Sequence, residues 1–267
     1  MKTNLLEING SIVSEIDLPK IFEIPYRPDL IHKVYVSLKT HELQPKGTDP
    51  TGGEKTSAQS WNTGRGVSRV ARVKGSGTGR ANKAGGVASV VGGRIAHPPR
   101  SEKNIHKSIN QKERRLALAS AIAATSNKEL VSLRGHKVNG VKIFPILVVD
   151  NIENINKTKD LLNVLTSLNL IDDVNRVLSS RKTRSGTSRI RGRTIRTGRG
   201  PLIVIGDDRG ICKAASNIPG VECVLVKNLT VLDLAPGSHP IRLVIWTKSA
   251  IEKLPKALLG IGEVIGS

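Results

Sequence analysis

The chain has 267 residues, 38% of them hydrophobic, which is enough to bury the core of one large α/β domain or two small ones. Its 42 lysines and arginines against 22 aspartates and glutamates give a formal net charge of +20, which indicates a polyanionic partner, with nucleic acid ahead of an anionic membrane. No run of about 18 apolar residues is present, and the amino-terminal 30 residues are rich in acids, so neither a membrane span nor a secretory signal is expected. We therefore expect a cytosolic protein.

Three elements are predicted from the amino-terminal part of the chain and from the stretch after residue 100. An Asn-Gly dipeptide between apolar stretches predicts a β-hairpin over residues 5–18. Apolar residues at helical spacing predict helices over residues 28–41 and 108–126. The second helix is expected to open with a capping box formed by Ser108 and Gln111.

The rest of the chain alternates apolar runs with helical patterns. Near-continuous β-branched runs predict strands buried on both faces of a sheet, at 143–150, 201–208, 221–226 and 241–246. Helical spacing predicts helices at 156–170, 171–180, 208–217 and 247–254. This succession of right-handed βαβ units predicts an α/β fold: a Rossmann-like, mainly parallel sheet with helices on both faces.

Two tracts hold most of the positive charge. Residues 46–100 carry ten basic and two acidic residues together with 12 of the 26 glycines, and they show neither a helical nor a strand period. A long stretch of this kind is expected to leave the globular domain, formed by 1–45 and 101–267, as an extended Gly/Arg-rich loop with its tip at about 64–80. Residues 181–200 carry eight basic residues and no acid, which predicts a second nucleic-acid-binding loop.

The composition of the two tracts favours folded RNA as the partner. Glycine lets the backbone approach phosphates, and arginine offers a planar fork to phosphate oxygens. Aromatic residues make up only 2% of the chain, so base stacking on an aromatic platform is not expected. Trp61 is the sole aromatic residue in either tract, and stacking on a base and local packing are equally compatible with the sequence.

A nucleotide-dependent enzyme is the first alternative. The stretch GTDPTGGEKT (47–56) departs from the spacing of a phosphate-binding Walker A loop, and GSGTGRA (75–81) has no flanking strand and helix of the dinucleotide-binding kind. The stretch ILVVD (146–150) resembles a Walker B strand, but an aspartate ends many parallel strands. A general, chromatin-like DNA-binding protein is the second alternative, supported by charge alone.

Other polar residues are given structural roles. Asp207 and Asp208 are expected to be a helix cap and its dipole partner rather than a catalytic or metal-binding pair. Cys212 and Cys223 are expected to be buried, reduced thiols, because they form no C-x-x-C or Cys/His cluster. We therefore expect no catalytic residue, no metal site and no cofactor.

Three segments carry a resemblance to a known family. They are SAQSWNTGRGVSRVARVKGSGTGRANKAGG (57–86), GGRIAHPPRSEK (92–103) and INQKERRLALASAIAATS (109–126). Through them, and over essentially its whole length, the chain resembles the large-subunit ribosomal protein four (universal L-four) family in its archaeal form. The resemblance implies a structural, non-enzymatic constituent of the large ribosomal subunit that binds and helps to assemble ribosomal RNA. It also implies a long loop that lines the nascent-peptide exit tunnel near its constriction.

The resemblance implies partners and site residues as well. The expected partners are large-subunit ribosomal RNA, neighbouring ribosomal proteins including large-subunit protein twenty-two at the constriction, and the nascent polypeptide, with no membrane and no small-molecule substrate. The tip segment matches residues 64–80, so Arg65, Arg69 and Arg72 are the tunnel-tip candidates. With the second tract, the candidate RNA-binding residues are Arg65, Arg69, Arg72, Lys74, Arg80, Lys83, Arg94, Arg100, Lys103, Arg114, Arg115, Arg181, Lys182, Arg184, Arg189, Arg191, Arg193, Arg196 and Arg199.

Overall fold

The computed structural model describes residues 1–239 and 241–257. The chain folds into two compact units. The sheet unit comprises Met1–Lys39 and Lys107–Ser267, and the basic unit comprises Thr40–His106.

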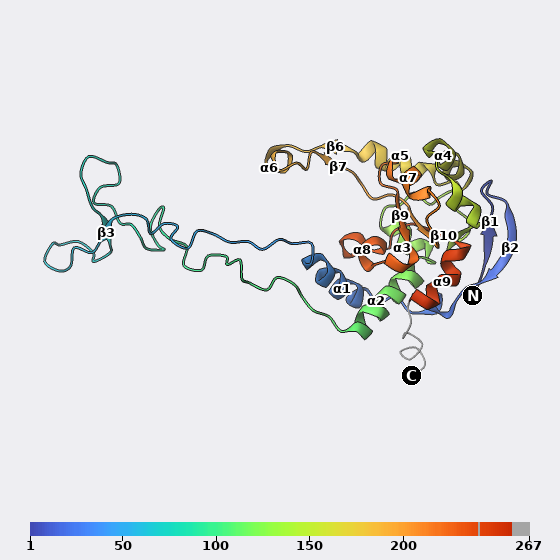
Figure 1. The fold of residues 1–267 in the computed structure, drawn as a ribbon, viewed down its shortest axis with the longest axis horizontal. Coiled ribbons are helices and arrows are strands. Elements are labelled where there is room, and N and C mark those ends of the chain that lie inside the picture. The colour runs from blue at the N-terminus through green and yellow to red at the C-terminus, as the bar shows by residue number, and fades with distance from the viewer. Residues whose placement is uncertain (240, 258–267) are drawn as a thin grey trace. The chain divides into compact units, whose positions relative to one another are not determined.

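The sheet unit contains a six-stranded, largely parallel sheet (Figure 1). Its strands, in spatial order, are β2 (Ile12–Asp17), β1 (Lys2–Leu6), β5 (Ile146–Val148), β10 (Val244–Thr247), β8 (Leu202–Ile205) and β9 (Glu222–Leu225). The β1–β2 pair is the predicted antiparallel hairpin, and every other pairing is parallel. The last of these strands along the chain, β10, lies between β5 and β8. The predicted mixed α/β fold with a mainly parallel sheet is confirmed.

Side chains from the central strands point alternately to the two faces of the sheet, and each face is covered by helices. Trp246 and Leu147 belong to one hydrophobic cluster, whereas their neighbours Ile245 and Ile146 belong to the other. The first cluster includes residues of α1 (Pro28–Thr40), α2 (Gln111–Ala124), α8 (Val231–Leu234) and α9 (Lys248–Ala257). The second includes residues of α3 (Lys128–Leu133), α4 (Thr158–Ser167), α5 (Ile171–Ser180) and α7 (Ile211–Ser216). Short 3₁₀ helices connect these elements at Lys20–Glu23, Asp150–Asn154, Val226–Asn228 and Pro236–Ser238.

The predicted capping box of α2 is wrong. The helix begins at Gln111 with Asn110 as its N-cap residue, and no side chain caps it by a hydrogen bond. Ser108 therefore lies two residues outside the position that a capping box requires, because the chain is still extended at Asn110, with ψ 139°. An ion pair of 2.7 Å between Lys33 and Glu113 lies in the first turn instead.

The two cysteines are free thiols, but the prediction that they are buried is wrong. Both are half-buried, because Cys223 lies on the edge strand β9 and Cys212 lies on the helix α7 that packs beside it. Their sulfur atoms are 2.8 Å apart. Partial burial raises the pKa of both thiols, so they remain protonated at neutral pH.

Candidate nucleic-acid interface

The carboxyl edge of the sheet is where an open α/β fold would bind a nucleotide. Here the edge is occupied by a buried carboxylate. Glu153 is 1% exposed and accepts hydrogen bonds from Gly206 N at 3.0 Å, Thr247 Oγ1 at 3.0 Å and Ser249 Oγ at 2.7 Å. Asp150, at the end of the stretch that resembles a Walker B strand, accepts from Ser249 N at 2.7 Å. Both acids therefore hold the ends of strands together, which argues against the nucleotide-dependent alternative.

Asp207 and Asp208 have separate structural roles. Asp208 Oδ1 accepts hydrogen bonds from Gly210 N at 2.9 Å and Cys212 N at 3.5 Å, and the bond from Gly210 is the main reason that the pKa of Asp208 is lowered. The N-cap residue of α7 is Gly210, so Asp208 is not the predicted cap; it lies two residues earlier and stabilises the turn that leads into the helix. Asp207 forms an ion pair with Lys253 of α9 at 2.6 Å, which lowers the pKa of its carboxyl group.

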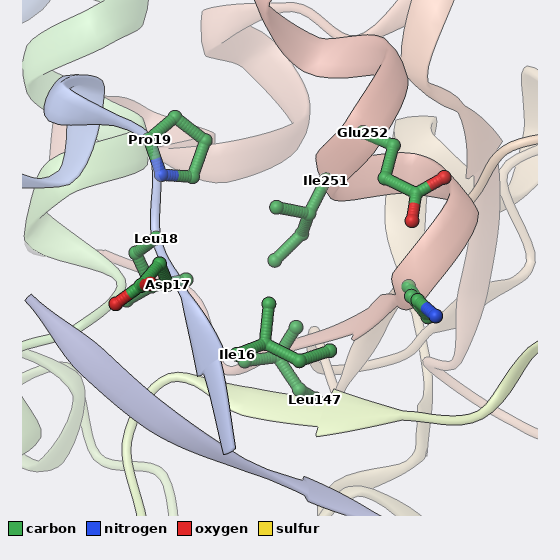
Figure 2. Close-up of a pocket in the computed structure, with 8 residues that line it drawn as sticks. Ile16, Asp17, Leu18, Pro19, Leu147, Ile251 and Glu252 are labelled. Carbon is green, nitrogen blue, oxygen red and sulfur yellow. The ribbon is translucent and has the colours of Figure 1, made fainter. Parts of the chain in front are cut away.

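A small pocket lies between the end of β2 and α9 (Figure 2). Its volume is about 230 Å³, and it is lined by apolar side chains, including Ile16, Leu147 and Ile251, and by the charged residues Asp17, Lys248 and Glu252. Small-molecule sites usually combine a larger volume with several converging polar groups. The pocket therefore supports no substrate site. Among the described residues, no three His, Cys, Asp or Glu side chains gather in a metal-binding arrangement, and no helix has the length and apolar character of a membrane span.

The second basic tract folds as a hairpin, which we call the basic hairpin (residues 181–200). It contains β6 (Lys182–Thr183) paired antiparallel with β7 (Ile195–Arg196), and a short helix α6 (Gly186–Ile190) lies between them. The backbone bond from Arg184 N to Thr194 O, 2.8 Å long, extends the pairing. Figure 1 shows the hairpin extending away from the sheet to which α5 and β8 connect it.

The basic unit contains two small loops on either side of one short strand. The strand β4 (Arg72–Val73) pairs with β3 (Ala58–Gln59), and Arg72 also bridges to Ala84. These pairings close one loop before β4 and another after it, and both are visible near β3 in Figure 1. Gly64 and Gly75 have positive φ angles, and a Cβ atom at either position would meet nothing within 4 Å. The loops are therefore open, with room for a partner close to their backbone.

Trp61 brings two of the three tunnel-tip candidates together. The guanidinium carbons of Arg65 and Arg72 lie 5.4 Å and 5.6 Å from the centre of its ring. Arg72 also donates to the Asn82 carbonyl at 3.0 Å. Arg69, the third candidate, is exposed and lies outside this cluster, although its carbonyl accepts from Ser60 at 2.8 Å. The structure thus favours local packing of Trp61 within the basic unit.

Most candidate RNA-binding residues are accessible. Of the 19 candidates, all of them in the described part of the chain, only Arg72, Arg115 and Arg184 are half-buried, and the others are exposed. Ion pairs between side chains are seen for two of these candidates within the described residues: Arg94 pairs with Glu54 at 3.0 Å, and Arg199 pairs with Glu222. The remaining exposed candidates form no such ion pair within the described residues.

A cleft in the basic unit contains two of the exposed arginines. It has a volume of about 660 Å³ and lies between residues 47–52 and residues 93–102. Arg94 and Arg100 line it. Asp49 and Glu102 line it as well, so the charges of its lining balance and the cleft by itself does not favour an anionic ligand.

Three polar residues at the base of the basic hairpin were not among the sequence candidates. They are Asp173, Arg176 and Arg242, which form a buried or partly buried polar network. Arg242 had a detectable signal, because it is a cation inside the apolar run 241–246. Nothing in the sequence near Asp173 or Arg176 distinguishes them from the surface residues of an ordinary helix.

The fold and these surfaces define a basic α/β protein with many exposed arginines and lysines. Comparison with known proteins agrees: the model of the Ribosomal protein L4/L1 family matches residues 16–257. Large ribosomal subunit protein uL4 of Methanosphaera stadtmanae is 48% identical over 253 residues, which cover 95% of this chain and 96% of that protein. The uL4 proteins of Sulfurisphaera tokodaii and Methanocaldococcus jannaschii are 45% and 44% identical, over 97% and 95% of this chain and 96% and 98% of their own lengths. The chain belongs to the ribosomal protein L4/L1 family, and these relatives are archaeal.

Proposed function

We propose that this chain binds large-subunit ribosomal RNA and helps it to assemble, and that its first basic tract lines the nascent-peptide exit tunnel near the constriction. Family membership makes the chain a structural, non-enzymatic constituent of the large ribosomal subunit, in the cytoplasm. The observation that carries the RNA proposal is the exposure of nearly all the cations in two segments that contain almost no acid.

The RNA proposal follows from the chemistry of these cations. Each exposed arginine or lysine that meets a phosphate releases a condensed counterion, so a segment with many of them binds tightly at low salt and weakly at high salt. The basic hairpin concentrates eight such residues without an acid to pair with them inside the tract. The hairpin is therefore the stronger candidate for a sequence-independent contact with the RNA backbone.

The tunnel proposal concerns the first basic tract. We propose that residues 46–100 form an extended loop inserted into a Rossmann-like globular domain of 1–45 and 101–267, with its tip at about 64–80. Open glycines and the cluster of Arg65 and Arg72 around Trp61 support a tip that approaches RNA closely and holds its guanidinium groups in place. The proposed partners there are ribosomal RNA, large-subunit protein twenty-two and the nascent polypeptide.

Salt-dependent RNA binding tests the first proposal. Binding to full-length large-subunit ribosomal RNA would be titrated against salt, with duplex DNA and an unrelated structured RNA as competitors. We expect tight, steeply salt-dependent binding that survives both competitors. Equal competition by duplex DNA would favour the general DNA-binding alternative, and micromolar binding of ATP or GTP by the free protein would revive the enzyme alternative.

Crosslinking tests the tunnel proposal separately. A photoreactive amino acid would replace Arg69 in assembled ribosomes that carry a stalled nascent chain, with Lys182 replaced in a control. We expect crosslinks to the nascent chain from position 69 and crosslinks to RNA alone from position 182. If neither position gave crosslinks to the nascent chain, the tunnel proposal would be contradicted, and the RNA-binding proposal would be unaffected.

A further inference from the structure

The helix α5, which leads into the basic hairpin, carries a buried carboxylate at the hairpin's base. Asp173 of α5 is fully buried and accepts hydrogen bonds from His136 Nδ1 at 2.9 Å, Lys137 N at 3.0 Å and Arg176 Nε at 2.9 Å. Arg176 Nη2 also donates to the carbonyl oxygen of Arg199 at 2.8 Å. One side chain in the second half of α5 therefore links the helix that leads into the hairpin to the hairpin's end.

The returning end is tied to a buried arginine. Arg242 has no exposed surface, and its Nε donates to Gly200 O at 2.6 Å. Its Nη2 donates to Gly220 O at 2.8 Å and Pro201 O at 3.3 Å, and its Nη1 donates to Glu222 at 2.5 Å. A buried guanidinium is tolerated only where acceptors surround it, and its rigid planar fork then fixes their relative positions.

Close backbone packing reinforces these side-chain bonds. Gly220 has φ +81°, and a Cβ atom there would lie 2.6 Å from Val177 Cγ1 and 2.8 Å from Gly198 O. Gly200 N also donates to Gly220 O at 2.8 Å. Moving the two ends of the hairpin away from Gly220 would break these contacts.

The hairpin itself has little that would order it alone. Its two strands have two residues each, and all its residues from 181 to 199, each described by the structure, are exposed or half-buried. A hairpin of this kind is marginal in water unless something else holds it. The hydrogen-bond network at its base can supply that support.

We propose that Asp173, Arg176 and Arg242 are positioning residues that fix the direction in which the basic hairpin presents its arginines to RNA. The proposal rests on the RNA-binding function proposed above. Arg176 and Arg242 direct their donors to the protein backbone and to Asp173 and Glu222, so they act through the hairpin and not by touching phosphate. A hairpin held in one direction loses less conformational entropy when it binds, which raises affinity without adding a contact.

A double-mutant cycle in the full chain tests the proposal. Arg176→Gln removes the link to Asp173 and to the Arg199 carbonyl, and it would be made both in the native chain and in a chain with Arg189, Arg191, Arg193 and Arg196 replaced by alanine. We expect Arg176→Gln to lower affinity for large-subunit ribosomal RNA about fivefold in the native chain and less than about twofold in the alanine background. Arg181→Gln, which removes one exposed arginine at the same base, is the matched control, and its effect should be similar in both backgrounds.

Hydrogen exchange supplies a readout that a purely structural role would not give. Arg176→Gln should speed exchange of the amides of residues 182–196 while leaving those of the central strands β5, β8 and β10 unchanged. Equal losses of affinity in both backgrounds, no loss in either, or faster exchange throughout the sheet would each overturn the proposal. Failure of the native chain to bind ribosomal RNA would instead overturn the proposed function. Arg176 is partly exposed, with 27% of its side chain accessible, so its replacement is better tolerated than that of Arg242.

Discussion

The basic hairpin and the loops of the basic unit have similar compositions but are held in different ways. Both are rich in glycine and arginine, and both expose their cations. The hairpin is anchored at its base by the buried Arg242, which is distant in sequence, and by Arg176, which the buried Asp173 holds in place. Within Thr40–His106, all of which the structure describes, only Thr40 and Gly85 are buried. Composition predicts that both segments bind nucleic acid, and we expect the buried contacts at the base of the hairpin to make it the more ordered of the two before binding.

The difference suggests two routes to binding. A segment with few buried groups loses conformational entropy when it meets its partner, so we expect the loops of the basic unit to become ordered on RNA. The basic hairpin is held at its base, so we expect it to lose less of that entropy on binding. Four predictions test this comparison.

Removing the hairpin's cations should have the largest effect on binding. Replacing Arg189, Arg191, Arg193 and Arg196 by alanine should lower affinity for ribosomal RNA by on the order of a hundredfold at moderate salt, and should reduce the slope of log affinity against log salt by about 3. The reason is the loss of about four phosphate contacts. A salt titration measures both quantities. An unchanged slope would show that the hairpin is a solvated surface, and the thermal melting temperature should not change in either case.

Removing the anchor should have the largest effect on stability. Arg242→Met removes a buried donor from Gly200 O, Gly220 O and Glu222, of which Gly220 O keeps its bond from Gly200 N and Glu222 keeps its ion pair with Arg199. The loss should lower the free energy of unfolding of the sheet unit by about 3 kcal/mol. Chemical denaturation measures this value. Arg181→Met, at an exposed position on the same hairpin, is the matched control and should change it by less than about 0.5 kcal/mol. Equal effects of the two substitutions would remove the distinction between anchor and surface.

Acid should weaken the anchor of the hairpin through two groups. Burial, with nearby Arg176 and Arg134, lowers the pKa of His136 despite its bond to Asp173. Burial works to raise the pKa of Asp173, but hydrogen bonds from His136 and Arg176 outweigh it, so the net pKa is lowered. Both groups therefore bind protons more readily in the unfolded chain than in the folded chain. The free energy of unfolding should fall as the pH drops through about 6.5, where His136 of the unfolded chain becomes protonated. It should fall again below about 3.8, where Asp173 of the unfolded chain becomes protonated.

His136→Gln isolates the first of these groups. Its free energy of unfolding should fall less steeply with decreasing pH just below 6.5 than that of the native chain, as measured by denaturation at a series of pH values. His97→Gln, at an exposed histidine of the basic unit, is the control and should leave the steepness unchanged. Parallel pH profiles for the native chain and His136→Gln would show that this histidine does not couple the anchor to pH.

The sequence predicted features that depend on neighbouring residues and missed those that depend on distant ones. The apolar runs around Leu147, Val204 and Ile245 predicted buried strands, because an unbroken run of β-branched residues is a local property. The order of those strands was not predictable, since β10 is the last strand along the chain and yet lies between β5 and β8. The half-burial of Cys223 follows from β9 being an edge strand, which is a property of the whole sheet.

The candidate nucleic-acid interface also has one part that the sequence predicted and one part that it did not. Exposure of the arginines in the two basic tracts followed from their number and from the lack of acids to pair with them. The network at the base of the hairpin did not follow, because most of its bonds join residues at least 20 positions apart, such as Arg176 with Arg199 and Arg242 with Gly200. Periodicity carries no information about such pairs.

The smallest effect is expected from removing the tip of the first basic tract. Deleting residues 64–80 and joining the ends with a short glycine linker should leave the thermal melt of the sheet unit unchanged, because no residue in that segment, which the structure describes in full, is buried. The matched deletion is 185–192 in the basic hairpin, which removes a segment of similar composition but retains both anchors. It should also leave the melt unchanged.

A loss of stability on deleting 64–80 would mean that the basic unit supports the sheet unit as the buried anchors do, and the contrast between the two basic segments would no longer hold. An unchanged melt together with weakened incorporation into large subunits would separate the two roles: the sheet unit folds on its own contacts, and the tip serves the assembled particle.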